Sequence, residues 1–224
     1  MSISDRGDGV MKRPVTAFFG GSFDPPHLGH LALARAALAS GVCDRVMWVP
    51  AYSPPHKRMR ERAPFADRLA MVELMIRDEP GMTANDIERR LALDPSYTID
   101  VMAALERENP DTELVLLVGG DSLLELHLWY RAEELAERYF VVTYPRSDPD
   151  EVRSRILAVW PRETAEKLLS GVLDGKIFEI SSTEIKKKMA KFPGRGDINS
   201  GALADAVIGY CRRRGLYTGV EEKR

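Results

Sequence analysis

The sequence has few cysteines, no long apolar run and almost no net charge, and each of these excludes a class of protein. Cys43 and Cys211 are its two cysteines, and no Cys-x-x-Cys pair occurs. Their number and spacing exclude a disulfide framework and a cysteine-rich zinc site. The apolar stretches, such as Leu114–Val118, are far too short to span a membrane. Residues 1–13 lack the apolar segment of a secretory signal, so we expect a cytoplasmic protein without a membrane partner.

Acidic and basic residues nearly cancel. The chain of 224 residues has 32 Lys and Arg against 34 Asp and Glu, which gives a formal net charge of −2. This excludes a dominant basic surface, so nucleic acid is not an expected partner. The length and a hydrophobic content of 44% suit one domain with a sizeable core. We expect this domain over 14–217, after a disordered extension over 1–13 and before a polar tail over 218–224; the sequence leaves open whether identical chains assemble.

Short runs of strand-forming residues alternate with helical patterns along most of the chain. Strands are expected over 15–19, 46–49, 82–87, 113–118, 140–143 and 176–180. Helices are expected over 28–39, 65–78, 97–108, 123–137 with a break near Trp129, 182–189 and 202–214. Residues 147–175 are helix-like and highly charged. The alternation predicts an α/β fold, a parallel sheet with helices on both faces.

Residues 20–30, GGSFDPPHLGH, hold the largest concentration of candidate ligand-binding residues and lie between an expected strand and an expected helix. Glycines at 20 and 21 let the backbone approach a ligand closely. The helix start that follows offers N–H groups and partial positive charge, which together bind phosphate. His27 and His30 are three residues apart, so they share one helix face and can donate hydrogen bonds to one anion. The pattern is neither a GxGxxG nor a Walker A loop; the alternative is a glycine turn with two incidental histidines.

These residues resemble the GxFDPxHxGH signature of the HxGH nucleotidyltransferases, and residues 180–183, ISST, resemble their second signature, ISSTxxR. Within that superfamily the chain is most similar to the bacterial nicotinate-nucleotide adenylyltransferases. Three further segments support this resemblance: Pro54–Lys57, Ser96–Thr98 and Gly120–Tyr130. The resemblance covers about residues 14–217 and implies a Rossmann-like nucleotidyltransferase fold.

The resemblance also implies a reaction, in which ATP and nicotinate mononucleotide give nicotinate adenine dinucleotide and pyrophosphate during NAD biosynthesis. Mg²⁺ would arrive with the ATP, and no metal site of the protein's own is expected. The implied catalytic residues are His27, His30 and Lys186, the last standing where the family motif has arginine. The implied ATP-binding residues are Gly20, Gly21, Ser22, Phe23, Lys57, Asp121, Ser181, Ser182 and Thr183. The implied mononucleotide-binding residues are Tyr97, Thr98, Trp129, Tyr130 and Arg146.

Several of these residues have a plain structural alternative. Ser181–Thr183 and Asp121 stand where helix N-caps are common. Lys57 is equally an exposed loop lysine, and a lone Trp129 would more often pack in a core. The role of the family arginine falls on Lys186 or on a neighbouring lysine, but the spacing around the helix favours Lys186.

Two other functions remain alternatives at this stage. One is another HxGH adenylyltransferase, which acts on nicotinamide mononucleotide or phosphopantetheine instead. The other is a regulatory module that binds a nucleotide without turnover. The histidine pair argues against the module, since a sensor has less need of contacts made only in a transition state.

Overall fold

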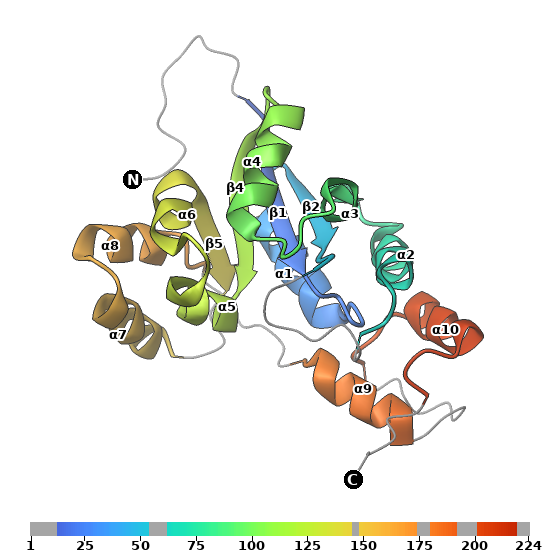
Figure 1. The fold of residues 1–224 in the computed structure, drawn as a ribbon. Coiled ribbons are helices and arrows are strands. Elements are labelled where there is room, and N and C mark those ends of the chain that lie inside the picture. Colours follow the sequence, from blue (N-terminus) through green and yellow to red (C-terminus); the bar gives the residue numbers. More distant parts are fainter. Residues whose placement is uncertain (1–12, 54–61, 145–147, 174–179, 192–200, 219–224) are drawn as a thin grey trace.

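The computed structural model describes residues 13–53, 62–144, 148–173, 180–191 and 201–218 (Figure 1). Within them, five parallel strands form one sheet in the order β3-β2-β1-β4-β5. The strands are β1 Val15–Gly21, β2 Arg45–Pro50, β3 Met82–Ala84, β4 Glu113–Gly119 and β5 Phe140–Tyr144. The expected extension and tail lie almost wholly outside the described residues. None of the helices in these ranges has the length and apolar character needed to cross a membrane.

Side chains along each strand alternate between two hydrophobic cores, as the two-residue period of a strand requires. On β1, Ala17 and Phe19 belong to one core and Phe18 to the other. On β4, Leu117 faces the first core and Leu116 the second. Both faces of the sheet are therefore buried, which is typical of parallel sheets.

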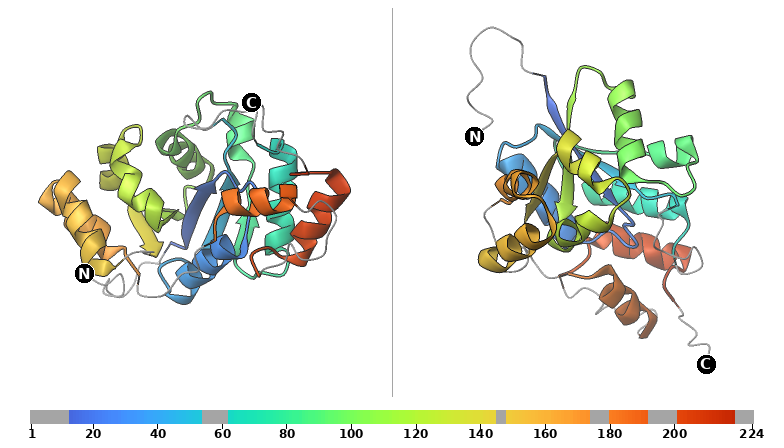
Figure 2. Two further views of the ribbon diagram at one scale, coloured as in Figure 1. Left: turned by 90° about the horizontal axis from the view of Figure 1, so that it is seen from below. Right: turned by 60° about the vertical axis from the view of Figure 1, so that its left-hand side comes forward.

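Helices cover both faces of this sheet (Figure 2). The first core is closed by α1 Leu28–Ala39, α2 Phe65–Ile76, α9 Ser182–Lys191 and α10 Asp205–Arg214. The second core is closed by α3 Ile87–Leu91, α4 Thr98–Glu108, α5 Gly120–Glu125, α6 Ala132–Arg138, α7 Pro149–Val159 and α8 Arg162–Ser170. The predicted α/β fold is confirmed, with a parallel sheet between two helical layers.

The strand order indicates where a ligand would bind to this sheet. From β1 the chain moves outward to β2 and β3, and it then returns to the other side of β1 as β4 and β5. In open α/β sheets, ligands bind beyond the carboxyl ends of the strands where this order reverses. That point lies between β1 and β4. The turn after β1 and the glycines after β4 meet there, at the lower edge of the sheet in Figure 1.

Three expected elements begin or end at other residues in the structure, and a fourth cannot be compared. The extended piece expected over 82–87 ends as a strand at Ala84, because the Asn85 side chain accepts the Ile87 N–H at 2.8 Å and starts α3. The helix expected over 123–137 begins earlier, at Gly120, and breaks where expected near Trp129. The helix expected from 202 begins at Asp205. The strand expected over 176–180 falls outside the described residues except at its end.

Candidate active site

Aromatic rings pack beneath the turn that follows β1. A Cβ on Gly20 would lie 2.7 Å from the ring of Phe18, and a Cβ on Gly21 would lie 3.1 Å from the ring of Phe23. Phe23 itself has a positive φ of 45°, which is rare for a residue with a bulky side chain. Its buried ring packs against Phe19 and Trp48. The two glycines therefore make room for aromatic rings, and their expected contact with a ligand stays a prediction.

His27 and His30 hold each other at the start of α1. The His27 backbone N–H donates to Nδ1 of His30 at 3.2 Å, and the His30 backbone N–H donates to Nδ1 of His27 at 3.3 Å. This is a reciprocal capping box, here made by two imidazoles. The rings stack with centroids 3.6 Å apart. Both Nδ1 atoms accept hydrogen bonds, so a neutral ring carries its proton on Nε2, the second nitrogen in the plane of the ring.

Gly29 lies between the two histidines and allows a close contact with the second motif. A Cβ at Gly29 would lie 3.1 Å from Nδ1 of His27 and 3.4 Å from Cβ of Ile180. A larger residue would therefore press on the His27 ring and on the chain just before α9. The sequence pattern HxGH thus has a packing reason in this chain.

The two motifs, about 160 residues apart in sequence, meet at the carboxyl ends of the strands. The Ser182 hydroxyl donates to the Pro25 carbonyl at 3.0 Å. Lys186 Nζ lies 2.9 Å from Oδ2 of Asp24, a carboxylate that is 4% exposed. In Figure 1, α9 accordingly lies below the ends of the strands. Lys187 and Lys188 are exposed, so the register of this helix agrees with the expectation, while the role of Lys186 stays a prediction.

The other oxygen of Asp24 joins two more parts of the chain. Oδ1 accepts the Ala63 backbone N–H at 3.0 Å and the Tyr217 hydroxyl at 2.7 Å. Burial, together with the Asp24 charge, raises the pKa of Tyr217, so the phenol stays protonated and donates. Asp24 therefore connects the turn, the residues before α2, α9 and the end of the described chain.

The expected mononucleotide side is built around the start of α4. Tyr97 is the N-cap of this helix and Thr98 its first residue. The rings of Tyr97 and Tyr130 stack with centroids 4.1 Å apart. Trp129 is half-buried and packs against the second core, while Tyr130 is 51% exposed. The structure thus pairs Tyr97 with Tyr130 and packs Trp129 against the second core, while the role of Trp129 in binding a ligand stays a prediction.

Some of the remaining expected site residues lie within the described structure and two lie outside it. Asp121 is exposed in the first turn of α5, but the N-cap of that helix is Gly119, so the capping alternative for Asp121 is wrong. Ser181 and Thr183 are exposed on either side of Ser182, where α9 begins. Lys57 and Arg146 lie outside the described residues.

Sequence reasoning assigned no role to the buried charged residues of this region. Arg68 and Glu88 are 2% and 5% exposed, and Asp24 was noted only as part of the motif. A signal was available for Arg68. It stands in α2 at the helical spacing of Met71, Val72 and Met75, so it occupies a position of the apolar stripe. A charge in such a position indicates a buried partner.

Comparisons with known proteins agree with this arrangement. The sequence profile of the family described as cytidylyltransferase-like matches residues 18–188. A Synechococcus sp. (strain JA-3-3Ab) protein named "Probable nicotinate-nucleotide adenylyltransferase" is 38% identical over 200 residues, which are 88% of this chain and 92% of that protein. A protein of the same name from Gloeobacter violaceus is 37% identical over 201 residues, which are 89% and 94% of the two chains.

A solved structure shares the fold over nearly the whole chain. It is described as Plasmodium falciparum nicotinic acid mononucleotide adenylyltransferase complexed with NaAD. It superposes with a TM-score of 0.72 at 18% identity, covering 93% of this chain and 100% of the other. From the profile match and the two bacterial relatives, the chain belongs to the cytidylyltransferase-like family and, within it, to the nicotinate-nucleotide adenylyltransferases.

Proposed function

We infer that this protein joins ATP and nicotinate mononucleotide into nicotinate adenine dinucleotide, releasing pyrophosphate, as a step of NAD biosynthesis. The observation that carries this function is the meeting of the two motifs. The histidine pair of α1 and the lysine of α9 converge on one turn at the switch point of the sheet. Relatives that carry the name of this activity match nearly the whole chain.

The reaction needs alignment more than it needs a protein base. A phosphate oxygen of the mononucleotide attacks the α-phosphorus of ATP, the bond from that phosphorus to the bridging oxygen breaks, and pyrophosphate leaves. The attacking phosphate is ionised near neutral pH, because its second pKa is about 6. The protein's part is to hold the two phosphates in line and to stabilise the charge that grows on the leaving oxygens.

His27 and His30 are the proposed donors to the phosphates. Their Nδ1 atoms accept backbone N–H groups, so the proton of each neutral ring is on Nε2, from which it can be donated to an anion. The capping box fixes both rings before a substrate binds. Donors that need no reorientation during the reaction stabilise a transition state most effectively. The proposed ATP-binding residues are Gly20–Phe23, Lys57, Asp121 and Ser181–Thr183.

Mg²⁺ is proposed to arrive on the ATP rather than to be held in a centre of the protein. Among the described residues, no three His, Cys, Asp or Glu side chains gather as a metal site. The buried carboxylate of Asp24 is also occupied by three hydrogen-bond donors of the chain. With Asp24 occupied in this way, the ion is proposed to be coordinated by phosphate oxygens and water.

The start of α4 is the proposed place of the nicotinate ring. A helix N-terminus favours a carboxylate, and Tyr97 and Thr98 stand at this one. Trp129 and Tyr130 are the aromatic residues nearest in sequence to the break after η2 (Leu126–Leu128), and both are proposed to contact the ring. Arg146, outside the described residues, is proposed to bind the mononucleotide as well.

One assay tests this function against its alternatives. Purified protein is given ATP, Mg²⁺ and, separately, nicotinate mononucleotide, nicotinamide mononucleotide or phosphopantetheine, and pyrophosphate release is measured. Release is expected to be fastest with nicotinate mononucleotide. Faster release with either other acceptor would replace the proposed substrate, and no release with any acceptor would favour the regulatory module.

Histidine variants tie this activity to the site. The variant His30→Ala is expected to lower kcat by about 100-fold or more with a smaller change in KM, since the lost contact acts in the transition state. The matched control is His127→Ala, an exposed histidine of η2, which is expected to keep kcat within about threefold of the parent. Equal losses in the two variants would remove the assignment of His30.

A cytoplasmic location is proposed on the state of the two cysteines. Cys43 and Cys211 are free thiols and buried. Burial raises the pKa of Cys43 to about 11 and of Cys211 to about 12, which keeps both as unreactive thiols. Such cysteines suit a reducing compartment.

A further inference from the structure

Each of the three guanidinium nitrogens of Arg68 donates a hydrogen bond to the backbone, and the three acceptors lie in three separate segments. Nε donates to the Ala63 carbonyl at 3.1 Å, Nη1 to the Ser22 carbonyl at 2.8 Å and Nη2 to the Ala51 carbonyl at 2.7 Å. Ser22 lies in the turn after β1, Ala51 follows β2, and Ala63 precedes α2. The side chain is 2% exposed. One planar group therefore fixes the relative position of all three segments.

An apolar side chain would fill this place at a lower cost in solvation. Burial lowers the pKa of Arg68, as does the positive charge of Arg62, while the charges of Asp24 and Glu88 act in the opposite direction, so burial of this cation carries a cost in solvation. The acceptors are three backbone carbonyls, and they match the fixed fork of a guanidinium. An ammonium also has three donors, but all three are on one nitrogen, whereas here three different nitrogens of one planar group each hold a carbonyl. The arrangement thus specifies arginine by geometry.

Two chains of hydrogen bonds lead from Arg68 to the proposed site, and we call them the first and second arm. The first arm holds the residues on either side of Phe23. Arg68 holds the carbonyl of Ser22, the residue before Phe23. Asp24, the residue after it, accepts the N–H of Ala63, whose carbonyl is also held by Arg68. Phe23 has a positive φ, a conformation that persists only where the surroundings hold it. Arg68 supplies such a hold on both sides of the residue.

The second arm leads to the start of α4. Tyr52, next to Ala51, donates its N–H to Oε2 of Glu88 at 2.7 Å. The same oxygen accepts the hydroxyl of Ser96 at 2.6 Å, and Ser96 Oγ accepts the N–H of Ser53 at 3.3 Å. Ser96 directly precedes Tyr97, the N-cap of α4. The position of α4 is thereby tied to the segment that Arg68 holds.

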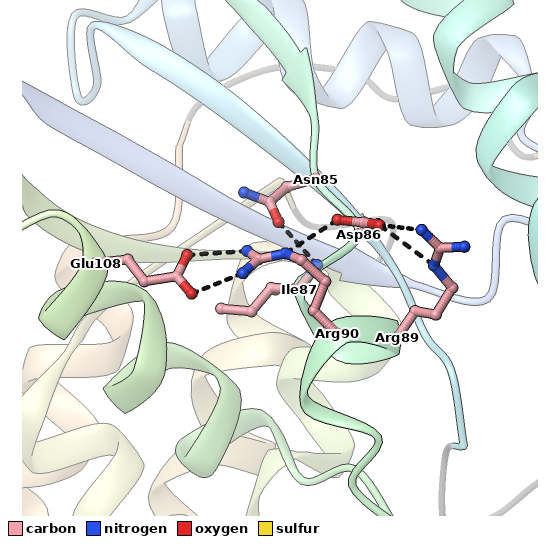
Figure 3. Close-up of polar contacts among 6 residues, drawn as sticks. All are labelled: Asn85, Asp86, Ile87, Arg89, Arg90 and Glu108. Atoms are coloured by element: carbon pink, nitrogen blue, oxygen red, sulfur yellow. Dashed lines mark hydrogen bonds and ion pairs between the residues drawn. The ribbon is translucent and has the colours of Figure 1, made fainter.

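Figure 3 shows that α3, which carries Glu88, is in turn fastened to α4. Arg90 makes two hydrogen bonds of 2.9 Å each to the carboxylate of Glu108. Asp86, at the start of α3, accepts hydrogen bonds from both Arg89 and Arg90. Arg90 and Glu108 are 45% and 40% exposed, so this pair adds little to stability, and the tie to the start of α4 depends mainly on the buried Glu88.

We propose that Arg68 is a positioning residue for nucleotidyl transfer, which sets the phosphate-binding turn after β1 relative to the N-terminus of α4. This inference rests on the proposed function, since those two places would hold the phosphates of ATP and the mononucleotide. A misplacement of about 1 Å between two reacting groups can cost about 100-fold in rate. Arg68 touches neither substrate in this account and acts through the backbone that does.

The variant Arg68→Lys tests the fork, because it keeps the charge and loses the planar group. Its kcat is expected to fall by about 10-fold or more, with each KM changed by less than about threefold. The matched control is Arg35→Lys, whose guanidinium also makes a forked pair, with Glu79, but on the exposed side of α1. That control is expected to keep kcat within about twofold. Equal kcat in Arg68→Lys and the parent overturns the proposal.

Hydrogen exchange separates positioning from general loss of stability. In Arg68→Lys, exchange of backbone amides is expected to rise in residues 20–24, 51–53 and 97–101, while the central amides of β4 exchange as in the parent. A uniform rise through β4 would mean that Arg68 only stabilises the fold, and it would overturn the proposal. This readout needs no activity, so if the parent protein releases no pyrophosphate it still tests whether Arg68 sets the turn after β1 relative to the start of α4, separately from the failure of the proposed function.

A milder variant covers the case in which Arg68→Lys does not fold. Ser96→Ala removes the hydroxyl between Glu88 and Ser53, which loosens the second arm alone. Its kcat is expected to fall by about threefold to tenfold, with faster exchange confined to residues 51–53 and 97–101. Unchanged kcat and unchanged exchange in Ser96→Ala would contradict the proposed link to α4.

Discussion

Lys186 Nζ lies 2.9 Å from Oδ2 of Asp24, so the cation of the second motif is paired with the carboxylate of the first. The carboxylate is buried, and the lysine side chain is 26% exposed. Only the lysine end of this ion pair is open to solvent, so the ammonium is the end that another anion can approach while the buried carboxylate keeps its ion-pair partner. The lysine therefore lies within reach of the turn where a triphosphate is proposed to bind, and Asp24 holds it there beforehand.

The first prediction concerns the three consecutive lysines of α9. Lys186→Ala is expected to raise KM for ATP and to lower kcat, because its ammonium alone of the three faces the turn. Lys186→Arg is expected to keep or improve activity, since a guanidinium restores a bidentate contact with phosphate. Lys187→Ala and Lys188→Ala serve as matched controls and should behave like the parent. Steady-state kinetics with ATP varied measures these effects. A loss of activity in Lys187→Ala or Lys188→Ala, with Lys186→Ala like the parent, would contradict the prediction.

The second prediction concerns the coupling between Asp24 and Lys186. Asp24→Asn keeps Oδ1 for Ala63 and Tyr217 but sets an amide against the ammonium. A double-mutant cycle with Lys186→Met, measured by urea unfolding, is expected to give a coupling of about 0.5–3 kcal/mol. Additive effects of the two substitutions would show that the pair contributes nothing to the fold.

Much of the fold was predictable because its signals are local. Four of the five strands, β1, β2, β4 and β5, contain an apolar run. Helix α1 was predicted over the residues it occupies, since strong helix formers end there before Gly41. The start of α3 was missed because it depends on one side-chain hydrogen bond, from Ile87 N–H to Asn85, in a stretch whose composition also suits a strand.

The site was predictable only as two separate motifs. The sequence indicated which residues carry the chemistry, but the contact of Lys186 with Asp24 joins positions 162 residues apart. The hydroxyl of Tyr217 reaches the same carboxylate across 193 residues. Contacts of this separation are set by the packing of α9 and α10 on the sheet, which no local pattern encodes. For the same reason the stacking of Tyr130 on Tyr97 was not foreseen.

The third prediction separates Trp129 from Tyr130. If Trp129 stacks on the pyridine ring, Trp129→Ala should raise KM for the mononucleotide far more than KM for ATP, by the roughly 0.5–1.5 kcal/mol typical of aromatic pairs beyond area burial. Tyr130→Ala removes the exposed ring that stacks on Tyr97 and leaves the core packing of Trp129 in place. It is expected to raise the same KM by a smaller factor. A Trp129→Ala protein with equal changes in both KM values, and a lower melting temperature, would indicate a core role only.

The last prediction concerns Asp67, which fastens α10 to α2. Its Oδ1 accepts the Tyr210 hydroxyl at 2.8 Å and Nε of Arg214 at 2.9 Å. Burial raises the pKa of Asp67, but the hydrogen bonds from Arg214 and Tyr210 lower it by more, so it lies below its ordinary value. A carboxylate whose pKa is lowered by folding stabilises the folded state above its unfolded pKa of about 3.9. That contribution is lost as the pH falls through the lower pKa of the folded state.

Asp67→Asn should therefore be less stable than the parent at pH 7, and the difference should shrink as the pH falls below about 4. Urea unfolding of both proteins between pH 7 and pH 2.5 measures this difference directly. Glu73→Gln is the matched control, an exposed carboxylate on the same helix, and its unfolding midpoint should follow that of the parent. The contact of Asp67 with α10 also affects the position of Tyr217, which follows α10 and whose hydroxyl donates to Asp24. A difference between Asp67→Asn and the parent that stays constant down to pH 2.5 would mean that the charge of Asp67 does not stabilise this contact.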